Sequence, residues 1–102
     1  MHRGGRMAVA ERILTVSTTF RRSVERSGVR AGSPAYRAVS ATMRALASAK
    51  IPGGGDYETS FAPGRAHVRR IVGYNLWILY RFDDDHVFIM TARGQPPIPV
   101  DE

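Results

Sequence analysis

Six residues between positions 67 and 93 of this 102-residue chain have side chains that suit phosphate or carboxylate chemistry. They are four arginines, a tyrosine and a histidine: Arg69, Arg70, Arg81, Arg93, Tyr80 and His67. Guanidinium groups bind phosphates and carboxylates through paired hydrogen bonds and stabilise negative charge in a transition state, but they exchange protons poorly. If the chain cleaves RNA, its chemistry falls on Arg70, Arg81 and Arg93. Tyr80 and His67 are then the only nearby candidates for proton transfer.

The strands that carry these residues decide which of them can meet. Arg69 and Arg70 are neighbours in the alternating segment "RAHVRRIV", so they point to opposite faces of a strand and only one lines any given groove. Arg93 lies just past the last predicted strand. We expect it to form, with Arg69 or Arg70 on an adjacent strand end, a cationic patch that binds RNA, DNA or an acidic target.

Each of these residues also has a purely structural interpretation. Arg81 lies inside a largely apolar strand, and a charge there needs a partner such as Glu58 or Asp56. Tyr80 fits a core aromatic residue, and His67 fits a solvated strand residue. Both interpretations of these side chains stay open at this point.

The charge of the chain predicts a negatively charged partner. The net charge is +6, and Lys50 is the only lysine among 15 basic residues. Residues 1–82 hold 14 basic and 4 acidic residues, a local excess of +10. Arginine-rich codon usage explains such a bias as well as a surface for phosphates or an acidic protein does.

The composition excludes several classes of protein. A hydrophobic content of 43% excludes a disordered chain, and no apolar run reaches the roughly 18 residues of a membrane span. The three histidines have no metal-ligand spacing, and cysteine is absent. We therefore expect a cytoplasmic protein with no metal, no cofactor and no membrane contact.

The order of elements predicts one α+β domain over residues 11–100, after a flexible basic tail at 1–10. "RILTVSTTF" alternates as a strand, "TFRRSVERSG" predicts a short helix that ends at Gly28, and "SPAYRAVSATMRALASAK" predicts a longer helix capped by Ser33. Lys50 lies favourably at the end of that helix. The remainder predicts strands and turns, with two helices on one face of a twisted, mainly antiparallel sheet.

The stretch "VGYNLWILYRFDDDHVFIM" predicts the central hairpin of that sheet, because both of its strands are apolar on both faces. The expected core joins the sheet to the helices: Leu14, Val16, Met43, Leu46, Ile78, Tyr80 and Ile89. Asp83, Asp84 and Asp85 predict a solvated turn, since three adjacent carboxylates cannot converge on one ion. The "GGG" at 53–55 predicts a loop, because no helix start follows it.

A strand, a helical hairpin and a meander carrying "RRIVGYNLWILYRFDDDHVFIM" and a final arginine resemble the RelE/ParE superfamily of bacterial toxins. The resemblance covers residues 12 to 98. It implies a growth-inhibiting toxin of a type II toxin–antitoxin pair, held by a cognate antitoxin. One branch of the superfamily cleaves mRNA in the ribosome, and the other inhibits DNA gyrase.

The residues favour the gyrase branch within that resemblance. Arg70 and Arg93 match basic positions of the nuclease groove, but Trp77 stands where nucleases commonly have an arginine. The tail "TARGQPPIPVDE" contains neither histidine nor tyrosine. We expect inhibition by binding gyrase, with mRNA cleavage as the alternative and a harmless nucleic-acid-binding module as a third hypothesis. A short neighbouring gene would favour the toxin.

Overall fold

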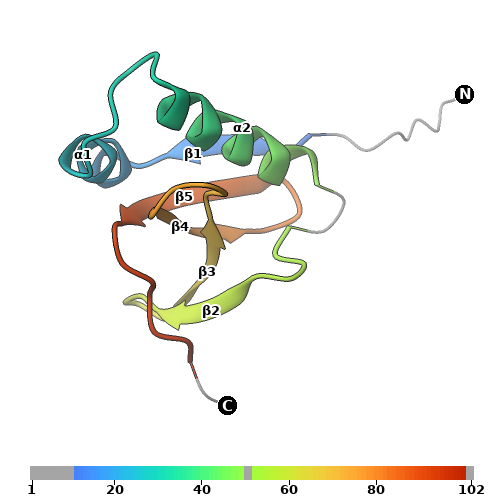
Figure 1. Cartoon of the computed structure of the whole chain (residues 1–102). Helices are drawn as coiled ribbons and strands as arrows, with labels where there is room; N and C mark the ends of the chain where they lie inside the picture. Colours follow the sequence, from blue (N-terminus) through green and yellow to red (C-terminus); the bar gives the residue numbers. More distant parts are fainter. Residues whose placement is uncertain (1–10, 50–51, 101–102) are drawn as a thin grey trace, which may run out of the picture.

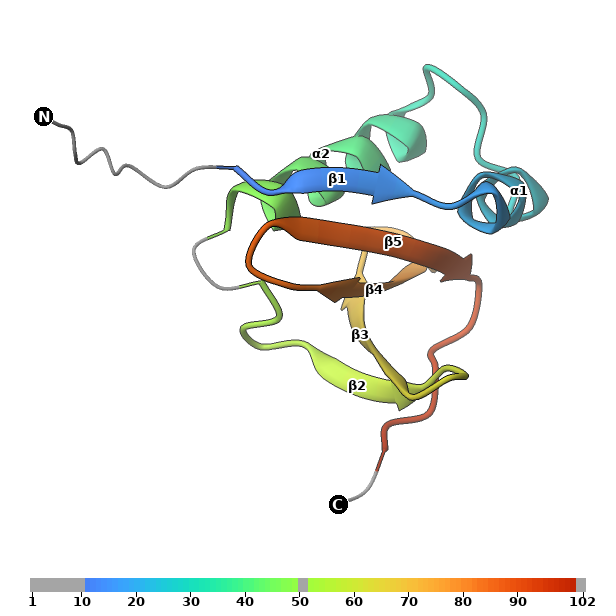
Figure 2. The same cartoon turned by 180° about the vertical axis from the view of Figure 1, so that it is seen from behind.

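Two helices pack on one face of a five-stranded mixed sheet in the computed structural model of this protein, which describes residues 11–49 and 52–100 (Figures 1 and 2). The predicted basic tail at 1–10 and Lys50 lie outside these residues. Seven elements follow one another along the chain: β1 (Ile13–Val16), α1 (Thr18–Arg26), α2 (Pro34–Ser48), β2 (Tyr57–Ser60), β3 (Arg65–Arg70), β4 (Trp77–Phe82) and β5 (His86–Arg93).

The sheet is ordered β1-β5-β4-β3-β2, and β4 is its central strand. Strands β2 to β5 form an antiparallel meander, while β1 pairs parallel to β5. The β4–β5 register shifts between Leu79 and Tyr80. The predictions of an α+β domain with a mainly antiparallel sheet and a central 72–90 hairpin are therefore confirmed.

The end of the first strand differs from the prediction. We expected "RILTVSTTF" to stay extended through Phe20, but α1 already begins at Thr18. Ser17 is the cause, because its hydroxyl accepts a hydrogen bond from the Phe20 amide at 3.0 Å and donates one to the Met90 carbonyl. A serine that caps a helix outweighs the strand preference of the β-branched residues around it.

The start of α2 and the end of α1 match the predictions. Ser33 caps α2 by accepting from the Tyr36 amide at 3.1 Å, and Pro34 occupies the first turn. Gly28 follows α1 with a φ of 83°, a conformation that favours glycine. Each helix buries one of its sides. Together the helices cover a single face of the sheet and form the upper layer in Figure 1.

The sheet has an apolar cluster on each face. On the first face, which the helices cover, Leu46, Ile78, Tyr80 and Ile89 are at most 1% exposed, and Leu14, Val16 and Met43 pack against them, which confirms the predicted core. On the second face a smaller cluster joins Ala66, Val68 and Leu79, with Trp77, Tyr57 and Phe61 around it.

The segment after β5 covers part of the second face. The Tyr57 hydroxyl donates to the Pro97 carbonyl at 2.7 Å, the Thr59 hydroxyl donates to the Ile98 carbonyl at 2.6 Å, and the Val100 amide donates to the Glu58 carbonyl. These contacts attach the segment to β2 and shield the edge of the sheet.

Two further predictions concern the turns and the chain as a whole. The Asp83–Asp85 segment is an exposed turn in which Asp83 Oδ1 accepts from the amides of Asp85 and His86, and these bonds lower the pKa of Asp83. Within residues 11–49 and 52–100 no acidic, histidine or cysteine cluster could hold a metal ion. No helix in the same ranges is long and apolar enough to cross a membrane.

Candidate functional site

The six candidate residues fall into three separate places in the structure. One group surrounds Asp56 on the first face, and Arg81 holds a turn on the second face. Arg70 and Arg93 flank Trp77 at one end of the second face.

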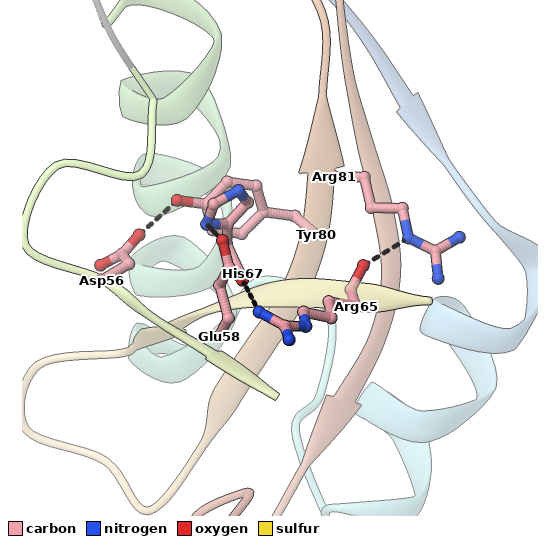
Figure 3. A network of polar contacts seen from close by, with 6 residues as sticks. All are labelled: Asp56, Glu58, Arg65, His67, Tyr80 and Arg81. Carbon is pink, nitrogen blue, oxygen red and sulfur yellow. Dashed lines mark hydrogen bonds and ion pairs between the residues drawn. The ribbon is translucent and has the colours of Figure 1, made fainter. Parts of the chain in front are cut away.

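Asp56 is the centre of a largely buried network at the start of β2 (Figure 3). One of its carboxylate oxygens accepts a hydrogen bond from the Tyr80 hydroxyl, and the other accepts from Arg69 Nε at 2.7 Å. Its side chain is only 8% exposed. Burial and the bond to Asp56 raise the pKa of Tyr80, and the same carboxylate raises the pKa of Arg69.

These contacts change the interpretation of Arg69 and Tyr80. Tyr80 is a core residue whose hydroxyl holds its proton through the neutral range, so it is a poor acid or base near pH 7. Arg69 is paired with a carboxylate and does not offer a free cation. Together they attach the loop before β2 to the central strand.

His67 is more buried than we predicted. Its ring stacks against Tyr80 at 5.4 Å and packs against Phe82 at 5.1 Å between ring centres. Its Nδ1 atom is buried and has no hydrogen-bond partner in the described part of the chain, although Glu58 Oε2 lies 4.0 Å away. The prediction of a solvated strand residue is therefore wrong. The close approach of Gly53, where an added Cβ would lie 3.3 Å from Nδ1, explains the burial.

Arg81 donates hydrogen bonds to backbone carbonyls of the β2–β3 turn and does not pair with an acidic residue in the described part of the chain. Its Nε donates to the Arg65 carbonyl at 2.8 Å (Figure 3). Its Nη2 donates to the carbonyls of Phe61 and Pro63 at 2.5 and 3.0 Å. The guanidinium also lies 5.5 Å from the centre of the Phe61 ring. The predicted pair with Glu58 or Asp56 is wrong, because the turn carbonyls satisfy the charge and Glu58 pairs with Arg65.

Arg70, Trp77 and Arg93 stand side by side across three strands. Trp77 of β4 is the register partner of Arg70 on β3 and of Arg93 on β5, so all three point to the second face. We call them the Arg70–Trp77–Arg93 row. The Arg70 guanidinium lies 5.5 Å from the centre of the indole, a cation–π distance, and both arginines are exposed.

An open groove continues from the row. Arg93 lines it together with Thr59 and Ser60 of β2 and the segment from Gly94 to Val100, and its volume is about 710 Å³. The groove places an exposed guanidinium beside a shallow, mostly uncharged channel. Such a surface can hold a phosphate or a carboxylate but offers no proton carrier of its own.

The row corrects one prediction and adds a residue to another. We expected Arg93 and either Arg69 or Arg70 to lie on adjacent strand ends. Instead, β4 lies between β3 and β5 and places Trp77 between the arginines. Sequence reasoning treated Trp77 only as a departure from a family pattern. The strand register is what makes it part of the surface, and no local sequence signal carries that register across three strands.

Histidine is the side chain most suited to proton transfer near pH 7, and neither histidine of the described residues lies at the row. His67 is on the first face. His86 lies seven residues before Arg93 on β5, roughly 23 Å along the strand. It contacts Asp83 and stacks on Phe88. Tyr57 shares the second face, but its hydroxyl donates to Pro97 and burial raises its pKa.

The fold defines the class as a small α+β domain with a helical hairpin on a mixed five-stranded sheet. No protein-family model, curated protein or solved structure matches this chain significantly.

Proposed function

We propose that this protein is the growth-inhibiting toxin of a bacterial toxin–antitoxin pair and that it acts by binding its target and not by cutting it. DNA gyrase is the target that the RelE/ParE resemblance implies, and the site of action is the cytoplasm. The observation that carries the proposal is the Arg70–Trp77–Arg93 row, an exposed pair of cations around an indole, beside which no histidine of the described residues lies.

The chemistry of the row supports binding over cleavage. RNA cleavage needs groups that accept and donate protons, and such groups typically contribute about a hundred- to ten-thousand-fold in rate. The candidates for this role are fixed elsewhere: Tyr80 is bonded to Asp56, and His67 is stacked between aromatic rings on the other face. An arginine–indole surface, by contrast, is well suited to anchor a protein partner, since Trp and Arg are enriched among the residues that dominate interface energies.

A cognate antitoxin is the second partner in this proposal. The net charge of +6 favours an acidic neutralising protein, which would gain affinity and association rate from the opposite charge. mRNA cleavage stays the alternative because two exposed guanidiniums also suit phosphate.

The first experiment is controlled expression in bacteria. The chain alone should arrest growth, and co-expression of the adjacent gene product should restore it. Arg93→Ala and Trp77→Ala should each abolish the arrest, whereas Asp84→Ala, a control in the exposed β4–β5 turn, should leave it unchanged. Normal growth with folded protein at verified high levels would contradict the proposal.

A further inference from the structure

Almost all of the excess positive charge lies on the helical hairpin and not on the sheet. Residues 18–48 contain six arginines and one glutamate, a local charge of +5 against +6 for the whole chain. The sheet and its loops are therefore close to neutral. The arginines of the hairpin are Arg21, Arg22, Arg26, Arg30, Arg37 and Arg44.

The two layers also differ in what their arginines contact. In the sheet layer, Arg69 pairs with Asp56, Arg65 pairs with Glu58, and Arg81 is bound to turn carbonyls. In the hairpin all six arginines are exposed, and none makes an ion pair within the described residues. Arg37 alone donates a hydrogen bond, to the Gly32 carbonyl at 2.7 Å. Among the described residues, the helix layer is thus the larger surface of unpaired arginines, and the Arg70–Trp77–Arg93 row is the smaller one.

The spacing of the hairpin arginines suits a phosphate backbone. Arg22 and Arg26 are four residues apart on α1, a rise of about 6 Å on one helix face. This rise is close to the distance between successive phosphates of an extended strand. Guanidinium groups also bind phosphate oxygens in pairs, which makes arginine a better phosphate ligand than lysine.

An acidic amphipathic protein segment fits this layer less well. The hollow between α1 and α2, about 310 Å³, is lined by Arg21 and Glu25 as well as by apolar residues. Of the apolar ones, Phe20, Val24 and Val39 are only 3%, 5% and 1% exposed, whereas Tyr36 is 42% exposed. A docking segment would cover little further apolar surface beyond Tyr36, so charge is the main attraction that the layer offers.

We infer that the helix layer is a nucleic-acid-binding surface, separate from the Arg70–Trp77–Arg93 row, that holds the phosphate backbone without reading its sequence. This surface would bring the protein to nucleic acid while leaving the row free for its target. The inference does not depend on the proposed toxin function, because it rests on the charge of the hairpin alone.

The experiment compares two variants that remove equal charge from the two layers. The full-length protein, Arg22→Gln/Arg26→Gln and Arg70→Gln/Arg93→Gln are titrated against a fluorescent 20-base-pair DNA duplex at 50 to 200 mM salt. Circular dichroism melts check that each variant is folded. Two lost phosphate contacts should reduce the salt slope by about 1.8 for the helix-layer variant only. Between these salt concentrations the wild type should then lose about tenfold more affinity than that variant.

Other outcomes overturn the inference. An unchanged slope for the helix-layer variant, or an equal reduction in both variants, would show that the hairpin is not a distinct surface. Polyglutamate that binds more tightly than the duplex at equal charge concentration would assign the layer to an acidic protein. Growth inhibition is measured separately, so a failure here leaves the toxin proposal standing, and the reverse also holds.

Discussion

Replacing Asp56 with alanine should destabilise the domain more than any other single change to the polar network of the first face. Asp56 accepts hydrogen bonds from Tyr80 and Arg69, and its side chain is 8% exposed. Its loss strands the Tyr80 hydroxyl, in a residue that is 0% exposed. A stranded buried donor costs about 1–3 kcal/mol, and the partly exposed Arg69 pair adds at most about 1 kcal/mol.

The expected loss is therefore about 1–4 kcal/mol of a total unfolding free energy of roughly 5–15 kcal/mol. It corresponds to a fall in melting temperature of roughly 4–32 °C for a domain of this size. Urea denaturation monitored by circular dichroism measures the free energy, and a calorimetric melt measures the temperature.

A double-mutant cycle isolates the stranded hydroxyl. Tyr80→Phe removes the donor and leaves Asp56 bound to Arg69. In the Asp56→Ala/Tyr80→Phe double variant no buried hydroxyl is stranded, so the combined loss should be smaller than the sum of the single losses by at least about 0.5 kcal/mol. Strict additivity, or an Asp56→Ala variant as stable as the wild type, would refute the role assigned to Asp56.

Three further predictions concern the same fold. Because the pKa of Tyr80 is raised in the folded state, this tyrosine ionises first in the unfolded chain, near pH 10. Stability should therefore hold below that pH and fall as the pH rises further. Urea midpoints at pH 8 and pH 11 should show a fall that Tyr80→Phe reduces, and an equal fall in both proteins would contradict the prediction. Gly53 has a φ of 91°, and a Cβ added there would meet His67 and Phe82 at 3.3 Å, whereas Gly55 has a φ of 83° and open space around it. Gly53→Ala should therefore destabilise the domain by more than Gly55→Ala, and equal urea midpoints would show that the close packing is unimportant. Arg81→Ala should release the β2–β3 turn and speed hydrogen exchange at the Phe61 amide, which bonds the Gly64 carbonyl, whereas Arg70→Ala should not; unchanged exchange would remove the turn role of Arg81.

The sequence predicts most of the architecture because local chemistry and long-range packing agree in this chain. Ser33, Pro34 and Gly28 are strong helix boundary signals, and the apolar runs on both sides of Asp83–Asp85 specify a central hairpin. The predicted end of the first strand was wrong because strand preference and helix capping compete over residues 17–20, and the helix cap prevails.

The candidate site was harder to predict, because it depends on partners that are distant in sequence. Residue types alone do not tell that Arg81 is held by backbone carbonyls or that Gly53 buries His67. They also do not show that β4 inserts Trp77 between Arg70 and Arg93, since this follows from the register of three strands. The charge of the hairpin was visible in the sequence, but only the fold shows that its arginines make no ion pair with the residues the structure describes.

Inhibition by binding through the Arg70–Trp77–Arg93 row can be tested with two assays: gyrase supercoiling with purified protein, and primer extension on cellular mRNA after induction. The wild type should block supercoiling, Arg70→Gln/Arg93→Gln should not, and transcripts should stay intact. Codon-phased cuts in translated mRNA with supercoiling untouched would contradict it.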